Sequence, residues 1–170
     1  NGSGVLGQRI DGVEALASAG GSQRPNICPN SNFELGLEGI YYSSPAAIDD
    51  GWANGAVLVI NSAPAGTLVV LPFFRANAGE HLIATLDARL ANLGAAGAVT
   101  FLRFYSSNAS FWTGITGATE GTYVTTSVEL SDDPADRTRF LVDAVVPADT
   151  VYGVLGFYAA GACDQLIIRR

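Results

Sequence analysis

The sequence predicts an all-β fold, a sandwich or barrel of about eight short strands, from Pro25 to the end of the chain. Short apolar runs rich in β-branched residues alternate there with turns rich in Gly, Pro, Asn and Asp. Apolar residues at helical spacing occur only before Pro25, which argues against an α/β fold. Hydrophobic residues make up 48% of the 170 residues, enough for one domain with a complete core.

Residues 1–24 are expected to form a helical stem followed by a Gly-rich hinge. Apolar residues in this stretch are spaced four, three and four positions apart, as in a coiled-coil seam: Leu6, Ile10, Val13 and Ala17. Gly7 and Gly12 destabilise such a helix by about 1 kcal/mol each relative to Ala. Two interpretations stay open: the end of a longer coiled coil that starts upstream, or a frayed linker. Residues 25–170 form the second predicted unit, a single β domain.

Four strands are predicted in the first half of this domain. Residues 55–61 and 66–74 are apolar runs separated by a Ser-Ala-Pro-Ala turn. Residues 81–90 alternate cleanly and predict a half-buried strand. Its inward positions are Leu82, Ala84, Leu86, Ala88 and Leu90, and its outward positions are His81, Thr85, Asp87 and Arg89. Residues 98–105 are apolar at successive positions and predict a central strand buried on both faces.

Four more strands follow. The alternating segments 123–130 and 140–146 place these side chains inward: Val124, Thr126, Val128, Leu130, Phe140, Val142, Ala144 and Val146. In 151–159, Gly153 and Gly156 suggest bulges or a concave bend. The last strand, 163–169, sends Asp164, Leu166 and Ile168 to one face, taken to be the inner one.

Charge and hydropathy exclude some classes of partner. The formal net charge is −7, and all nine basic residues are Arg, so a nucleic-acid partner is not expected. No apolar run approaches the about 20 residues that span a bilayer, so membrane insertion is not expected either. Because the chain starts with Asn1, we expect a fragment or a processed product. An acidic surface without Lys suits a neutral or cation-bridged partner.

The two cysteines lie near the two ends of the predicted domain. Terminal strands of a closed sandwich often lie side by side, so a disulfide between Cys28 and Cys163 is one interpretation. The alternative is two separate buried thiols that pack as small hydrophobic side chains. A domain of this size folds without a disulfide, so the second interpretation stays open.

A motif near residue 30 resembles a known family. Pro29-Asn30 is followed by Phe33-Glu34 and by Gly36, with Trp52 downstream. This pattern is similar to the first strand of the jelly-roll carbohydrate-binding modules that are attached to xylanases and cellulases, and it also recurs in bacteriophage tail and fibre proteins. Four later segments resemble the family in order and spacing: 73–90, 98–108, 147–150 and 164–168. One departure is that Gly39 precedes Ile40 instead of Trp, so that Trp52, after Gly51, takes the place of the family's tryptophan through a longer loop.

The resemblance implies a jelly-roll β-sandwich and a structural calcium where the first and last strands meet. The matching ligand positions are Glu34 and Asp164, with Asn32 as a weaker third. Ca²⁺ takes several oxygen ligands, and an inward-facing Asp164 would need a partner for its charge. The alternative is that Asp164 pairs with an Arg or accepts hydrogen bonds from backbone amides.

Aromatic side chains are the candidate carbohydrate platform, because the apolar face of a sugar ring stacks on a flat aromatic ring. Trp112 is the first candidate, since Asn108, Ser110 and Thr113 supply polar neighbours. The further candidates are Tyr42, Tyr41, Trp52, Phe111 and Tyr123. For each of them the alternative is that it fills the core.

Catalytic patterns are weak. His81 is the one histidine, and its place at the start of an alternating strand favours a surface position over a catalytic triad. Neighbouring carboxylates such as Asp49-Asp50 and Asp132-Asp133 are typical of turns. The chain is therefore expected not to be an enzyme.

Together these observations predict a non-catalytic domain that binds a cell-surface or extracellular glycan. The stem and terminal module resemble receptor-binding parts of phage tail fibres or tail tips, which implies a homotrimer on a virion tail or other cell-surface appendage. Two alternatives stay open. One is a structural or assembly module of a virion, whose aromatic residues contact other subunits. The other is a monomeric carbohydrate-binding module of a secreted bacterial polysaccharide-degrading enzyme.

Overall fold

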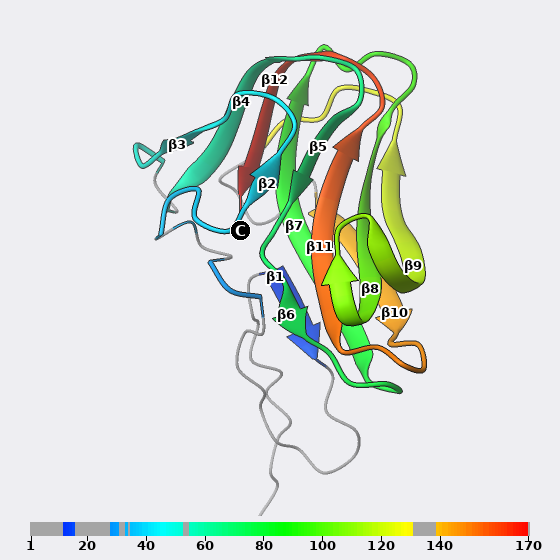
Figure 1. Ribbon diagram of the computed structural model, residues 1–170. Coiled ribbons are helices and arrows are strands. Elements are labelled where there is room, and N and C mark those ends of the chain that lie inside the picture. Colours follow the sequence, from blue (N-terminus) through cyan, green and yellow to red (C-terminus); the bar gives the residue numbers. More distant parts are fainter. Residues whose placement is uncertain are drawn as a thin grey trace, which may run out of the picture.

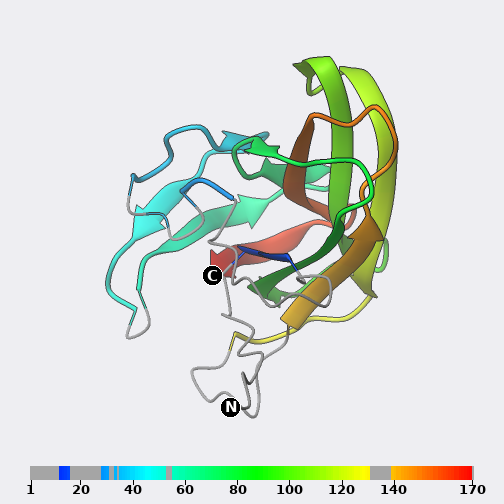
Figure 2. The same ribbon diagram turned by 90° about the horizontal axis from the view of Figure 1, so that it is seen from below.

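The protein is a sandwich of two antiparallel β-sheets. The computed structural model describes residues 12–15, 28–30, 33, 35–52, 55–130 and 139–169, with backbone alone at 12–15, 108 and 109. Every regular element in this part of the chain is a strand, and it contains no helix that could cross a membrane. Figures 1 and 2 show the two sheets facing each other. The predicted all-β jelly-roll sandwich is confirmed.

The first sheet, sheet A, runs in the order β1-β7-β12-β4-β3, and β10 pairs with β7 as well. Its strands are β1 (Gly12–Ala15), β3 (Ala47–Asp49), β4 (Val57–Ala63), β7 (His81–Ala91), β10 (Arg139–Val145) and β12 (Cys163–Arg169). The long strand β7 is its centre: β12 and β1 pair with successive parts of β7, while β10 pairs with residues 81–87. Sheet A therefore contains both the first and the last strand of the described chain, β1 and β12.

The second sheet, sheet B, runs in the order β2-β5-β11-β8-β9, and β6 pairs with β11. Its strands are β2 (Tyr41–Tyr42), β5 (Thr67–Val70), β6 (Phe74–Arg75), β8 (Ala98–Ser110), β9 (Thr113–Val124) and β11 (Tyr152–Ala159). The pairing of β8 with β9 is irregular at three places, so this hairpin bends along its length. In Figure 1 its far end curls in front of the sheet.

The core lies between the sheets and follows the alternation read from the sequence. All five inward positions of residues 81–90 are buried, as are the four of 140–146. The pairing of β7 with β10 sets Phe140 beside Leu86 and Val142 beside Ala84. The Phe140 ring meets Phe157 of β11 edge to face, with centroids 5.0 Å apart, so this pair joins the two layers.

Strand boundaries were predicted less well. Segment 123–130 is wrong as a strand, because β9 ends at Val124 and Val128 forms a single bridge to Leu90. Strands β2, β3 and most of β9 were not predicted from the sequence. The predicted helix is wrong over Gly12–Ala15, which forms β1 and pairs with residues 82–85. The rest of residues 1–24 lies outside the described residues.

Gly153 and Gly156 do not mark bulges, because β11 pairs with β8 without interruption from Tyr152 to Ala159. They make room for rings instead. A Cβ atom at Gly153 would lie 2.6 Å from the Phe74 ring, and one at Gly156 would lie 2.1 Å from the Phe101 ring. Each glycine thus lets an aromatic ring lie flat against the sheet.

Asp87 is buried, although the alternation placed it on the outer face of its strand. It is 1% exposed, and its neighbours in register are Arg139 on β10 and Arg169 on β12. Arg139 Nε donates a hydrogen bond to Asp87 Oδ1 at 3.2 Å, and Arg169 is itself 2% exposed. An Arg–Asp–Arg row therefore crosses three strands of sheet A, which compensates a carboxylate that would be costly to bury alone.

The disulfide interpretation is wrong, and the alternative of two buried thiols holds. Cys28 and Cys163 both lie in the main core as thiols. Burial raises the pKa of the Cys28 thiol to about 12. The pKa of Cys163 is raised as well, by burial first and then by the negative charge of Asp164. Both thiols stay protonated near neutral pH and so react slowly with oxidants.

Candidate functional site

The outer face of sheet B carries a second apolar cluster, separate from the core. Along β8, Leu102 and Phe104 face the core, so Phe101, Arg103 and Tyr105 face the other way. The cluster has these members, the last three of them partly buried: Val70, Phe101, Tyr105, Val154, Leu68, Phe111 and Tyr152. A sheet face with large apolar side chains that is only partly covered is a common place for a binding site.

The end of the β8–β9 hairpin covers one side of this cluster. Tyr105 Oη donates a hydrogen bond to the carbonyl of Phe111 at 3.4 Å, and Ser110 Oγ lies 2.7 Å from Thr113 Oγ1 at the tip. The Phe111 ring stacks on Tyr41 of β2, with centroids 5.7 Å apart and planes inclined by 16°. Trp112 meets Phe111 edge to face at 4.9 Å. The tip is thereby fixed over the sheet.

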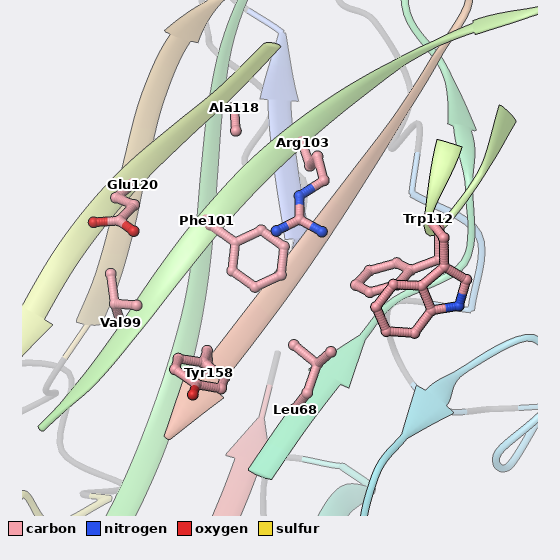
Figure 3. Close-up of a pocket in the computed structure, with 9 residues that line it drawn as sticks. Leu68, Val99, Phe101, Arg103, Trp112, Ala118, Glu120 and Tyr158 are labelled. Atoms are coloured by element: carbon pink, nitrogen blue, oxygen red, sulfur yellow. The ribbon is translucent and has the colours of Figure 1, made fainter. Parts of the chain in front are cut away.

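A groove of about 360 Å³ lies beneath the tip. Its lining comes from four strands and the tip: Leu68, Val99, Phe101, Arg103, Phe111, Trp112, Ala118, Glu120 and Tyr158. Figure 3 shows these side chains around an open centre, with Trp112 and Glu120 at opposite ends. A mostly apolar groove with few polar groups, in this size range, is typical of small-molecule and oligosaccharide sites.

The floor of the groove is the Phe101 ring. Because Gly156 lies beside Phe101 in register and has no side chain, the ring can lie flat over β11. Trp112 stands at the rim and is 74% exposed, although it is a large apolar side chain. Tyr158 is partly exposed on the side of the groove away from the tip. The groove thus has a largely buried aromatic ring at its floor and an exposed one at its rim.

Two charged groups lie on either side of the floor. Figure 3 places the Phe101 ring between Glu120 and Arg103. The Arg103 guanidinium lies 5.2 Å from the Phe101 centroid and 5.1 Å from the Phe111 centroid, so two rings hold it. The pKa of Tyr105 is raised by burial, and the neighbouring Arg103 acts in the opposite direction. The groove therefore has a hydrogen-bond donor, Arg103, on one side of its floor and a hydrogen-bond acceptor, Glu120, on the other.

Three of the sequence-predicted aromatic residues belong to this site, and one of them, Phe111, lines the groove. Trp112 lines the groove, and Tyr41 supports its wall through Phe111. Tyr42 pairs with Val69, a core residue, so it faces away from Tyr41 and from the groove. Tyr123 is exposed next to Val99, beyond the lining residues.

The remaining predicted residues are not brought into the groove. Trp52 lies beside β3, and its Nε1 donates to Asp49 Oδ2 at 3.1 Å. Asn108 is in β8, and its side chain is outside the described part, as are Asn32 and Glu34. Asp164 is exposed and accepts a hydrogen bond from Asn92 Nδ2 at 2.6 Å, so its predicted inward orientation is wrong.

Most of the residues that line the groove were not predicted from the sequence. Phe101 and Arg103 stand at alternate positions of 98–105, a segment interpreted as buried in the core on both faces. The signal available was Arg103 itself, because a charge in the middle of an apolar strand indicates one face that is not core. Glu120 and Tyr158 gave no such signal, since they meet Phe101 and Val99 through strand pairing alone.

Comparison with solved structures shows that the fold is similar to that of several carbohydrate-binding modules. A Clostridium thermocellum xylanase 10B fragment with a family 22 carbohydrate-binding module, complexed with xylohexaose, matches with a TM-score of 0.57 and 11% identity over 81% of this chain and 26% of that one. A family 16 carbohydrate-binding module matches with a TM-score of 0.52 and 12% identity over 85% of this chain and 96% of that one. These similarities show the fold alone.

The same fold occurs within a phage protein. The enzymatically active domain of bacteriophage CBA120 tailspike protein 4 matches with a TM-score of 0.56 and 10% identity over 86% of this chain and 21% of that one. The chain thus spans about a fifth of that tailspike domain and about a quarter of the xylanase fragment. No protein-family model matches the sequence, and no curated protein does so either.

Proposed function

We propose that the protein is a non-catalytic domain that binds a glycan in the groove on sheet B. The observation that carries this proposal is an indole that is 74% exposed at the rim of a groove whose floor is another aromatic ring. Exposing a large apolar ring is unfavourable unless a ligand covers it. The C–H face of a sugar ring does so, because it is flat and apolar while its hydroxyl groups lie around the edge.

The polar groups of the groove suit the rim of hydroxyl groups on a sugar. Arg103 only donates hydrogen bonds and Glu120 only accepts them, and a hydroxyl group does both. Carbohydrate-binding modules with a similar fold support the proposal that this protein binds a glycan, but not the choice of a particular sugar.

A binding role is favoured over hydrolysis by the charges in the groove. Glu120 is the one carboxylate among the lining residues, whereas glycoside hydrolysis usually needs two that flank the bond. His81 contacts Asp143 on sheet A, so this pair is remote from the groove on sheet B. The described groove therefore lacks the second group that the reaction requires.

Glycan binding is tested with a panel of soluble oligosaccharides and polysaccharides measured by titration calorimetry and affinity electrophoresis. We expect weak, reversible binding of at least one class, with dissociation constants in the micromolar to millimolar range that single shallow sites give. The panel includes xylo-, gluco- and manno-oligosaccharides and bacterial surface polysaccharides. Absence of binding to every member would contradict the proposal.

We propose further that the domain belongs to a phage-type tail fibre or tail tip and acts there as a homotrimer. Occurrence of the fold in a tailspike supports this setting. Occurrence in a xylanase supports the alternative of a module in a secreted enzyme. Light scattering on the chain separates them: we expect a trimer of about three times 17.6 kDa for the tail setting, and a monomer would favour the enzyme.

A calcium ion remains a proposal for the junction of the first and last strands. Asp164 is exposed at the start of β12 and supplies one of the three proposed ligands, while Glu34 and Asn32 lie outside the described part. Among the residues that the structure describes, no three His, Cys, Asp or Glu side chains gather as a metal site. The fit is therefore partial, and a chelator experiment is the appropriate test.

If calcium binds, a chelator is expected to lower the melting temperature by several degrees, because a ligand at 100 times its dissociation constant adds about 2.7 kcal/mol. The matched variant is Asp164→Asn, which is expected to melt at the chelated temperature with or without chelator. Identical melting curves of the wild-type protein in calcium and in chelator would contradict the metal.

A further inference from the structure

We propose that the groove selects a sugar residue that carries a carboxylate, and that Arg103 binds this group. The inference rests on the proposed glycan-binding function and specifies its ligand. Three features lead to it: the position of the guanidinium in the lining, the fixing of its orientation, and the placement of negative charge around it.

Arg103 is held in place before any ligand arrives. Its guanidinium lies 5.2 Å from the Phe101 centroid and 5.1 Å from the Phe111 centroid, so it contacts both rings. These contacts hold the rings and the guanidinium together, which reduces the entropy that binding would otherwise cost. A guanidinium is also planar, with parallel N–H groups that match the two oxygens of a carboxylate.

The described structure gives this cation no carboxylate partner. The described ion pairs join Arg89 to Glu129, Arg139 to Asp87 and His81 to Asp143, all of them on sheet A or beside it. The one acidic residue of the groove, Glu120, lies beyond the Phe101 ring. A cation between aromatic rings, in a groove lined mostly by apolar side chains, interacts more strongly with an anion than it would in open solvent.

The arrangement orients the ligand. A carboxylate at Arg103 and hydroxyl groups near Glu120 place the sugar ring over Phe101, with Trp112 at the rim. The reverse orientation sets two carboxylates against each other at Glu120. The chain has a formal net charge of −7, so long-range attraction does not gather anions here. Selectivity must therefore come from direct contact with Arg103.

The experiment compares acidic oligosaccharides with neutral forms of the same chain. Suitable pairs are oligogalacturonate, oligomannuronate and glucuronic-acid-substituted xylo-oligosaccharide, each with its carboxyl groups intact or methyl-esterified. Calorimetry on the wild-type protein is expected to show at least tenfold tighter binding of the acidic form of the best pair. Arg103→Gln is expected to lose this preference while it binds the neutral form within about threefold of wild type.

The matched control is Arg75→Gln. Arg75 also lies over an aromatic ring, 4.5 Å from the Tyr152 centroid, but it is exposed on β6 and does not line the groove. It is expected to keep the full preference for the acidic form. Circular dichroism and melting curves show whether either variant alters the fold.

Each outcome decides between the two proposals. Equal wild-type affinity for acidic and esterified forms, or an Arg103→Gln variant that keeps the preference, overturns the carboxylate inference and leaves glycan binding intact. Tighter binding of a sulfated galactan than of any carboxylate, dependent on Arg103, also overturns it in favour of a sulfate ester. Failure of every acidic and neutral member to bind overturns the proposed function itself.

Discussion

Trp112→Ala is expected to weaken glycan binding roughly 30-fold, or about 2 kcal/mol, because loss of an aromatic side chain that stacks on a ligand commonly costs this share of the affinity. The indole is 74% exposed and contacts Phe111 at the rim of the groove. Its removal therefore takes little from the core, and the melting temperature is expected to stay within about 2 °C of wild type. Titration calorimetry and thermal melting check the two halves of this prediction.

Tyr42→Ala is the matched control. Tyr42 is a partly exposed aromatic residue on the same sheet, but it faces the side opposite to Tyr41 and the groove. Its loss is expected to leave the affinity unchanged. If Tyr42→Ala weakened binding as much as Trp112→Ala, or if Trp112→Ala bound as wild type does, the ligand would lie elsewhere than in the groove.

The second large effect concerns stability. Asp87→Asn is expected to lower the free energy of unfolding by about 3–5 kcal/mol, since it removes the negative charge from between two arginines while Arg169 stays buried. The substitution keeps the shape of the side chain, so the loss reports the charge and not a cavity. Urea unfolding at neutral pH, followed by tryptophan fluorescence, measures the change.

Asp143→Asn serves as the comparison. Asp143 also contacts a basic side chain, His81, on a neighbouring strand, but both partners are about half exposed. An exposed pair contributes at most about 1 kcal/mol, so this variant is expected to unfold near the wild-type urea concentration. An Asp87→Asn variant as stable as Asp143→Asn would contradict the role assigned to the buried Arg–Asp–Arg row.

The core could be predicted from the sequence because alternation fixes which side chains share a face. The pattern of residues 81–90 and 140–146 holds in the structure, where Leu86 and Phe140 meet across the β7–β10 pair. Asp87 shows the limit of this reasoning. Alternation assigned its face correctly, but its burial depends on arginines that lie 52 and 82 residues away along the chain and are set beside it by strand pairing.

Local propensity was the weaker guide. Residues 12–15 carry a helical spacing, yet they form β1, because β7 offers an unpaired edge beyond the end of β12. Asp164 was predicted to face inward with Leu166 and Ile168, but it is exposed at the start of β12 and bonded to Asn92. In both cases the outcome depends on neighbouring strands that the local sequence does not reveal.

The groove could be predicted only in part. Trp112 was found because it stands among polar residues in a turn-like segment. The floor was not found, because Phe101 in an apolar strand looks like any core residue. What makes it a floor is the bend of the β8–β9 hairpin, together with Gly156 on a strand 55 residues later. The residues of a site on a sheet face come from several strands, and the pairing register of those strands decides which of them lie together. The sequence of one strand does not reveal that register.

The most direct test of glycan binding in the groove uses the two tryptophan side chains. The chain has two, Trp112 at the groove and Trp52, whose indole N–H is bonded to Asp49 beside β3. Two-dimensional ¹H–¹⁵N NMR resolves both indole signals during titration with the best oligosaccharide of the panel. We predict that the Trp112 signal shifts progressively to saturation while the Trp52 signal stays in place. A shift of the Trp52 signal with an unmoved Trp112 signal would contradict the assignment of the groove as the binding site.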